Sequence, residues 1–340
     1  MKCSPVTRQR WQRFRRHRRG WVSLWLFIFL FGLSLVAELI SNDRPIVVFY
    51  NGSYHFPLLV SYPEKHFGGD FDTETDYRDP FIHDRLTANG NWLLFPPNPH
   101  RYDSINGQLT MPAPSPPTSE NWLGTDDRGR DVLARLIYGF RLSVLFALGL
   151  TAIAVAIGMV AGAIQGYFGG RTDLYLQRFM EIWGSLPELY LLIIFSSLFE
   201  PNLWLLVLLL SLFGWMSLAD YVRAELLRAR QLTYAKAARA LGVSHTMIIL
   251  RHLLPNTLTP VITFLPFRIS GAVLSLTSLD FLGLGVPPST PSLGELLRQG
   301  KANIEAWWLS LTTFIVLSLL LLLLNFIGEA LRDAMDPQQE

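Results

Sequence analysis

The chain has 340 residues, of which 50% are hydrophobic and 16% are charged, and its formal net charge at pH 7 is +2. In a typical soluble domain about a quarter of the residues are charged, so this composition argues against a soluble protein. The single cysteine, Cys3, excludes an internal disulfide framework and a thiolate metal site. We therefore expect an integral membrane protein.

The first residues, 1–20, form a basic tail with eight lysines and arginines and no acidic residue. Under the positive-inside rule such a tail lies in the cytoplasm. The apolar segment 21–41 follows, and about 20 apolar residues suffice for a helix to cross the hydrocarbon core. A cleaved signal peptide is the alternative, but no A-x-A-like cleavage site follows this segment, which has the length of a full span. The sequence therefore predicts an uncleaved first transmembrane helix.

The segment 42–137 differs in composition from the rest of the chain. Two β-prone runs flank Asn51-Gly52, a dipeptide that is typical of a two-residue hairpin turn. Acidic residues and then a proline-rich stretch follow the hairpin. We expect a small irregular or β-containing periplasmic insertion, which serves either as a cap or as a docking surface for a soluble binding protein.

Five more apolar segments have the length of a span, at 138–164, 178–199, 203–219, 260–282 and 308–328. The first and the fourth of these are rich in small residues, which allow helices to pack closely inside a bundle. Together with 21–41 they predict an all-α integral membrane protein with six transmembrane helices. The last five would form a core of residues 138–330.

An even number of spans places both termini, including 331–340, in the cytoplasm. It also places 42–137 and the turn 200–202 outside, and the loops 165–177 and 220–259 inside. The loop 220–259 carries six lysines and arginines and few acidic residues. This second cluster of positive charge supports the same orientation.

The loop 220–259 contains the sequence YAKAARALGVSHTMIILRHLLPN (234–256). Ala237-Ala238 places small side chains on a helix, and Gly242 permits the positive φ or the tight turn that ends it. Ser244 is a good N-cap for a second helix, which we expect to end before the Pro-Asn pair that closes this sequence. A helix–turn–helix with a small-residue face suits a groove in a partner protein, whereas the alternative is an ordinary amphipathic loop.

Five blocks of sequence resemble, in order, the dipeptide/oligopeptide permease family of ABC importers: NWLGTDDRGRDVLARLIYGFRLS (121–143), GYFGGRTD (166–173), the sequence 234–256, DFLGLGVPP (280–288) and NFIGEALRDAMDP (325–337). They match the second, C-type membrane subunit of that family, which has a cytoplasmic N-terminus, an outer segment and six spans. The basic start and the long outer segment are most similar to the Yej-type permeases of microcin C and peptide importers.

The resemblance implies the type I ABC importer permease fold and a location in the bacterial inner membrane. It also implies a heterodimer with a sister permease, two ATP-binding domains, a periplasmic peptide-binding protein and a peptide substrate, but no nucleic acid. ATP and Mg would be bound by the partner ATPase, and this chain would hold no cofactor and no metal. The chain would form half of the translocation pathway.

In this family the loop that matches 220–259, known as the EAA loop, contacts the ATPase. The matching residues of this chain are Ala237, Ala238, Gly242, Arg251, Leu254 and Pro255. We expect the small residues to make the close-packed contact and Leu254-Pro255 to return the chain to the membrane. Lys236 stands where the family motif has glutamate, which leaves docking intact but argues against a salt bridge at that position.

No motif in the sequence indicates an enzyme. GELLRQGKA (294–302) has five residues between its glycines, whereas a Walker phosphate-binding loop has four, and Ala302 replaces the hydroxyl residue that follows the lysine. The sequence contains neither an H-E-x-x-H pair nor a G-x-S-x-G elbow. We therefore expect ATP hydrolysis in a separate ATPase subunit.

Two sets of charged residues call for an interpretation. Asp126, Asp127 and Asp131 stand at the start of a helix, where carboxylates cap free amides and offset the helix dipole, and we favour this over a cation site. Arg268 lies well inside the fifth span, where an unpaired charge costs at least about 2.5–3.5 kcal/mol. We expect it to line the peptide pathway and contact a substrate carboxylate, or else to pair with a carboxylate such as Glu188 or one on the sister subunit.

Two other functions stay open. An ion-gradient-driven secondary transporter is the alternative function, although the sequence shows no internal repeat of the kind that such proteins contain. A membrane scaffold or receptor that transports nothing has no need of a long coupling loop. The sequence thus predicts a permease subunit of an ATP-driven peptide importer, and a stoichiometric ATPase partner distinguishes it from both alternatives.

Overall fold

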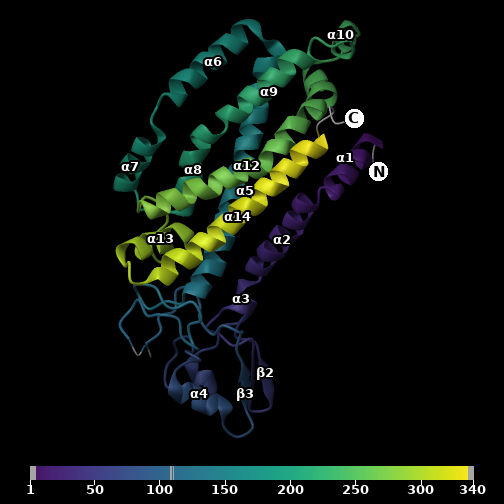
Figure 1. The fold of residues 1–340 in the computed structure, drawn as a ribbon. Coiled ribbons are helices and arrows are strands. Elements are labelled where there is room, and N and C mark those ends of the chain that lie inside the picture. The colour runs from purple at the N-terminus through teal and green to yellow at the C-terminus, as the bar shows by residue number, and fades with distance from the viewer. Residues whose placement is uncertain (1–4, 108, 110, 336–340) are drawn as a thin grey trace. The chain divides into compact units, whose positions relative to one another are not determined.

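The computed structural model describes residues 5–107, 109 and 111–335, and these residues are mainly helical (Figure 1). Residues 1–4 of the predicted basic tail and 336–340 of the predicted C-terminal segment lie outside the described residues. The chain divides into two compact units, which are a core unit of Met1–Ile28, Ser143–Pro287 and Ser318–Glu340, and an insert unit of Phe29–Leu142 and Pro288–Leu317.

Five stretches of helix are long and apolar enough to cross a membrane: α2 (Arg18–Leu35), α5 (Val132–Phe168), α8 (Leu203–Gly214) with α9 (Met216–Ala229), Thr257–Phe281 of α12, and α14 (Trp307–Met335). The helices α6 (Gly170–Gly184) and α7 (Glu188–Leu198), which are bent by 62° relative to each other, are together long and apolar enough for a sixth span. With this pair counted as one span, the described chain contains the six spans that the sequence predicts.

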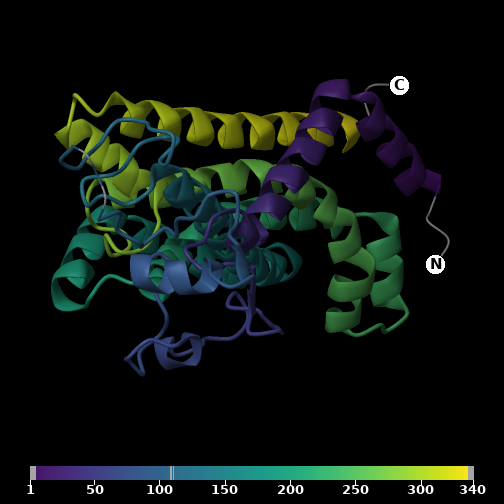
Figure 2. The ribbon, with the colours of Figure 1, turned by 90° about the horizontal axis from the view of Figure 1, so that it is seen from below.

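Among the described residues, six shorter α-helices complete the set: α1 (Pro5–Arg16), α3 (Ala37–Ile40), α4 (Pro80–Thr87), α10 (Thr233–Ala240), α11 (His245–Met247) and α13 (Leu293–Ala302). The chain bends between α1 and α2, so that α1 is not a continuation of the first span (Figure 2). The basic tail, for which the sequence analysis assigned no structure, is therefore helical from Pro5 onward.

The third span is broken, although the sequence predicts one continuous helix over 178–199. Three residues that end in Pro187 separate α6 from α7. Proline lacks an amide hydrogen and disfavours the helical conformation at the residue before it, so the helix ends there. The segment 165–177 is also not the predicted loop, because α5 continues to Phe168 and α6 begins at Gly170.

Helix α5 approaches α9 closely. Gly158, Gly162 and Gly166 recur at every fourth residue of α5 and face α9. A Cβ atom added to Gly162 would lie 2.4 Å from the carbonyl oxygen of Ala219, so a larger residue would push the two helices apart. The prediction that the small-residue-rich second span packs inside a bundle is confirmed.

The helix that follows the turn at Gly242 does not end before Pro255-Asn256, so this prediction is wrong. α11 (His245–Met247) leads into a π-helical turn, η2 (Ile248–Leu253), which continues directly into α12 (Leu254–Phe281). Pro255 lies in the first turn of α12, a position where its missing amide hydrogen and fixed φ are tolerated. A continuous helical path therefore joins this loop to the fifth span.

The insert unit contains the predicted hairpin and a third strand that the sequence did not reveal. β1 (Val47–Tyr50) pairs in antiparallel fashion with β2 (Ser53–His55) and with β3 (Trp92–Leu94). Asn51 and Gly52 have φ values of 47° and 80°, and positive φ at both residues is the type I′ geometry expected of this dipeptide.

The insert unit also has a small hydrophobic core. α4 (Pro80–Thr87) contacts β1 and β3, and the 3-10 turn η1 (Glu64–Phe67) lies nearby in contact with α4. The buried residues that join these elements are Val48, Phe67, Tyr77, Ile82 and Leu86. The insertion is therefore a folded module, and the β structure that the sequence predicts is only part of it.

Candidate functional site

The residues predicted to contact a partner lie mainly on one helix–turn–helix, Thr233–Leu253, which we call the docking segment. Gly242 has a φ of +73°, and its amide donates to the carbonyl oxygen of Arg239 at 3.1 Å, so α10 ends as the sequence predicts. The hydroxyl of Ser244 accepts a hydrogen bond from the amide of Met247 at 3.4 Å, which is the predicted N-cap.

One face of the docking segment is buried against the core unit. Ala235, Ile248 and Leu253 are buried in a single apolar cluster with residues of α5 and α9, which include Ala163, Tyr167, Leu218, Val222 and Leu226. Close-packed interiors transmit a displacement instead of absorbing it. The docking segment is therefore in direct packing contact with α5 and α9.

Tyr167, near the end of α5, links the two halves of the docking segment. Its hydroxyl lies 2.7 Å from Nδ1 of His245, at the start of α11. The guanidinium of Arg239, on α10, lies 5.2 Å from the centre of the Tyr167 ring, within the range of a cation–π contact. Arg230 donates to the carbonyl oxygen of Tyr167 at 3.1 Å. These contacts fix the orientation of both helices relative to α5.

The solvent-exposed side of the docking segment carries large apolar side chains. Leu241 is 83% exposed, and Met247 and Leu250 are exposed as well. Exposed apolar groups on one element are typical of a surface that contacts another protein. Sequence reasoning missed these three residues. The pattern that could have indicated them is the presence of large apolar residues in a loop rich in lysine and arginine.

The six residues predicted to contact a partner do not all have the same surroundings. Ala237, Gly242, Arg251 and Pro255 are exposed, whereas Ala238 and Leu254 are half-buried. Ala238 packs against the apolar cluster beneath the docking segment. Leu254 and Pro255 form the start of α12 and not a separate return to the membrane.

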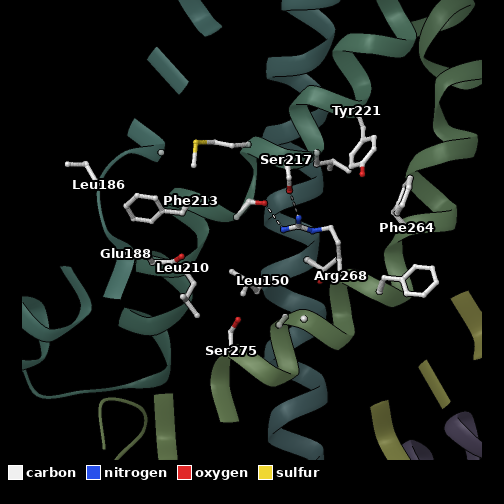
Figure 3. A pocket seen from close by; sticks show the side chains of 18 residues that line it. Leu150, Leu186, Glu188, Leu210, Phe213, Ser217, Tyr221, Phe264, Arg268 and Ser275 are labelled. Carbon is white, nitrogen blue, oxygen red and sulfur yellow. Dashed lines mark hydrogen bonds between the residues drawn. The ribbon is translucent and has the colours of Figure 1, made fainter. Parts of the chain in front are cut away.

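A cavity of about 780 Å³ lies within the core unit (Figure 3). Its wall comes from α5, α8, α9 and α12 and from the residues around the break between α6 and α7. Most of the lining is apolar, with charged side chains from Arg268 and Glu188 and hydroxyl groups from Ser217, Tyr221 and Ser275. A mostly apolar wall with a few polar groups is typical of a small-molecule site.

Arg268 lies in this cavity without an acidic partner. Its Nη1 donates to Oγ of Ser217 at 2.8 Å and its Nη2 donates to the carbonyl oxygen of Gly214 at 2.5 Å (Figure 3). Its Nε is buried and has no hydrogen-bond partner, and within the described chain no carboxylate pairs with the guanidinium. Glu188 lines the same cavity but makes no ion pair with Arg268 there, so the predicted pairing of these two residues is absent.

Of the three aspartates that precede α5, only Asp131 is seen to cap the helix as the sequence predicts, whereas the carboxylate of Asp126 forms ion pairs with arginines. Asp131 accepts a hydrogen bond from the amide of Ala134 at 2.8 Å and so caps α5. Asp126 is fully buried and pairs with Nη2 of Arg130 at 2.6 Å and with Nε of Arg135 at 3.5 Å. Among the described residues, no group of three or more His, Cys, Asp or Glu side chains is arranged to hold a metal ion.

Comparisons with known proteins agree with these features. Residues 154–340 match the family described as binding-protein-dependent transport system inner membrane component. Residues 5–63 match the N-terminal transmembrane domain of oligopeptide transport permease C. In the solved structure of the inward-facing methionine ABC transporter MetNI, one chain is similar in fold, with a TM-score of 0.50 and 18% identity over 59% of this chain and 97% of that chain.

Three relatives indicate how far the similarity extends. The inner membrane ABC transporter permease protein YejE of Escherichia coli (strain K12) is 54% identical over 338 residues, which cover 99% of both chains. The peptidoglycan transport system permease protein YejE of Agrobacterium fabrum is 49% identical and covers 99% of this chain and 94% of its own. The oligopeptide transport system permease protein OppC of Haemophilus influenzae is 36% identical over 71% of this chain and 77% of its own.

Proposed function

The chain belongs to the family of binding-protein-dependent transport system inner membrane components, and from this premise we propose how it couples an ATPase to peptide movement. It is a membrane-spanning permease subunit of an ABC importer for peptides, of the Yej type. As a permease it supplies a passage and not a catalytic centre. ATP and Mg would be bound by a partner ATPase, and this chain would need no cofactor of its own.

The observation that carries the proposal is the two-sided construction of the docking segment. Leu241, Met247 and Leu250 would enter an apolar groove of the ATPase, beside the exposed small residues Ala237 and Gly242. The opposite side is packed on α5 and α9. Closure of the ATPase dimer would therefore move these two helices.

The continuous helix from η2 into α12 offers a second route for the same motion. Arg251 and Leu254 lie on this path, and Arg268 lies further along α12, in the wall of the cavity. A continuous helical path that carries both Arg251 and a cavity residue would change the cavity when the ATPase moves. ATP would then favour one of two conformational states through different contacts in each.

The cavity is proposed as this subunit's half of the peptide pathway. Arg268 offers an unpaired guanidinium to a substrate carboxylate, and such a charge at membrane depth is typical of a substrate pathway. Glu188 offers the opposite charge, which suits the amino terminus of a zwitterionic peptide. The proposed substrates are oligopeptides and peptide-like compounds, including peptides derived from peptidoglycan and antibiotics of the microcin C type.

The proposed assembly is a heterodimer with a sister permease, two ATP-binding domains and a periplasmic peptide-binding protein. Both termini and the docking segment would lie in the cytoplasm, and the insert unit's folded module would face the binding protein. The positive charge of the first twenty residues and of the docking loop supports this orientation.

A pull-down from membranes in mild detergent tests the proposal. Tagged wild-type chain should bring down the sister permease and a stoichiometric ATPase. Leu241→Asp should lose the ATPase and keep the sister, as should Gly242→Asp, because a charge in an apolar groove is costly. Leu59→Asp is the matched control, since Leu59 is 81% exposed in the insert unit and should lose neither partner.

Two results of the pull-down would contradict the proposal. If no ATPase accompanies the wild-type chain under conditions that keep the sister permease bound, coupling to an ATPase fails, and transport driven by an ion gradient becomes the better explanation. If Leu241→Asp and wild type retain the same amount of ATPase, the docking segment is not the contact.

A further inference from the structure

The N-terminal helix α1 and the start of α2 present a dense group of positive charges. Arg8, Arg15, Arg16, Arg18 and Arg19 are all exposed. Residues 1–20 contain no acidic residue, and within the described chain none of these five arginines forms an ion pair. On α14, the carboxylate of Asp333 lies 3.7 Å from Nε2 of His17 and forms no ion pair with these arginines. The arginine group is therefore uncompensated.

This helix is fixed to the core unit and is not a free arm. The side chain of Phe14 is buried in a cluster with Ala330 and Ala334 of α14. Nη1 of Arg10 donates to Oγ1 of Thr259, near the start of α12, at 3.3 Å. The amide of Gly20 donates to Nδ1 of His17 at 3.2 Å, which stabilises the bend between α1 and α2. The orientation of the arginines is thus set by α12 and α14.

A row of tryptophan rings connects α1 to the first span. The rings of Trp11 and Trp21 lie 5.6 Å apart, and those of Trp21 and Trp25 lie 5.7 Å apart. More than half of Trp11 and of Trp25 is exposed. Tryptophan is enriched where a membrane meets water, at the level of the lipid headgroups. A row of tryptophans at this level would place the arginines of α1 at the height of the lipid phosphates.

We propose that α1 and the start of α2 form a binding surface for the headgroups of anionic phospholipids in the cytoplasmic leaflet. The proposal uses the cytoplasmic orientation of the N-terminus given above, but it does not depend on the transported substrate. Exposed guanidinium groups bind phosphate oxygens through charge-assisted hydrogen bonds. Clusters of four or more basic residues directly beside a transmembrane helix are typical of anionic-lipid recognition. Because α1 contacts α12 and α14, bound lipid would hold the cytoplasmic ends of both helices together.

Native mass spectrometry of the whole complex in detergent tests this surface. The complex is titrated with phosphatidylglycerol, with phosphatidylcholine, or with soluble glycerol 3-phosphate, and the bound molecules are counted. Wild type should prefer phosphatidylglycerol by about fivefold for each arginine that reaches a phosphate, and the preference should fall as salt rises. Glycerol 3-phosphate should not compete at equal concentration, because it lacks the acyl chains that lie against the exposed Trp25 face of α2.

A variant with Arg8, Arg16, Arg18 and Arg19 all changed to Gln should bind the two phospholipids within about twofold of each other. These four are suitable because none makes a side-chain hydrogen bond, an ion pair or a cation–π contact with another described residue. The same four positions changed to Lys keep the charge and should retain the preference. An unchanged preference in the Gln variant, an equal affinity of wild type for both phospholipids, or full competition by glycerol 3-phosphate would each overturn the proposal. The salt dependence of wild type decides the matter should the Gln variant fail to assemble.

Discussion

Arginines withdrawn from solvent occur in both units of the protein, and they differ in what neutralises them. In the insert unit, Arg130 and Arg135 share the buried carboxylate of Asp126. In the core unit, Arg268 has only a hydroxyl and a carbonyl oxygen, and within the described chain no carboxylate pairs with it. The first arrangement satisfies a charge within the fold. The second leaves a charge available to a molecule that enters the cavity, which is why we assign stability to one and transport to the other.

The backbone contacts of the two arrangements support the same distinction. Arg130 also donates to the carbonyl oxygen of Pro288 at 2.9 Å, and Arg135 donates to that of Thr290 at 2.9 Å. These bonds join two stretches of the insert unit that lie more than 150 residues apart in sequence. Arg268, by contrast, joins α12 to residues next to the junction of α8 and α9 only through uncharged groups.

The largest expected effect is on stability, from Asp126→Asn. The change leaves Arg130 and Arg135 buried without a counter-charge, and breaking a buried pair in this way typically costs about 3–5 kcal/mol. The yield and the thermal midpoint of the purified complex should both drop. Asp127→Asn is the matched control, since Asp127 is exposed and its loss should change stability by no more than about 0.5 kcal/mol. Equal effects of the two changes would remove the structural assignment of Asp126.

The next effect is on transport, from Arg268→Ala. Loss of a hydrogen bond to a charged group is worth about 1.5–3 kcal/mol, so uptake of a peptide with a free carboxylate should fall by about 10-fold to 100-fold. Complex yield should stay near that of wild type. The specific measurement compares this peptide with its C-terminal amide. Wild type should discriminate between them and Arg268→Ala should not, whereas the same discrimination in both would exclude contact with the carboxylate.

A smaller effect is expected from Glu188→Gln. If Glu188 contacts the amino terminus, this change should lower uptake of the free peptide by severalfold and leave an N-acetylated peptide unaffected, because only the former carries a positive end. Uptake assays with the two peptides measure it. Should Glu188→Gln reduce uptake of both peptides equally, Glu188 serves the shape of the cavity and not its charge.

The smallest effect concerns pH. Burial, and then the nearby Arg78, lower the pKa of His100 in the insert unit below its ordinary value. Above the unfolded pKa of about 6.5, His100 is neutral in both the folded and the unfolded protein, and its full contribution to stability is present. As pH falls from there through the lower pKa of the folded state, the unfolded state takes up the proton more readily, and this contribution is lost. The thermal midpoint should therefore decrease from pH 7.5 to pH 5.5, and His100→Gln should flatten this slope. An equally steep slope in the variant would assign it to other groups.

The sequence predicted the spans well because their signal is local: about 20 apolar residues in a row leave few alternatives. It also predicted the turn at Gly242 and the two-residue hairpin turn at Asn51-Gly52, since both depend on residues that tolerate positive φ. The break at Pro187 was missed because apolar residues continue on both sides of it. The helix was wrongly ended at Pro255, because a proline in a first helical turn looks the same in sequence as one that stops a helix.

Other features depended on contacts that a single sequence does not display. β3 is short and pairs with β1 from about 45 residues away, and the short helix α4 contacts both strands. The periodicity of β3 and α4 is too brief to recognise. The folded structure determines which residues surround Leu241 and Arg268. Only these surroundings show that Leu241 is exposed and that Arg268 has no acidic partner within the described chain. The sequence indicated that an unpaired charge at Arg268, inside a membrane span, would be energetically unfavourable. Only the structure shows that the guanidinium donates to Ser217 and Gly214.

The central claim is that ATP-driven movement reaches the peptide pathway through the docking segment. The most direct measurement is ATP-driven uptake of a labelled peptide by the whole complex in lipid vesicles, with wild type and Leu241→Asp compared at equal protein. We predict that Leu241→Asp loses nearly all uptake while the membrane subunits remain assembled. Uptake by Leu241→Asp at the wild-type rate, or uptake by wild type without ATP, would contradict the account.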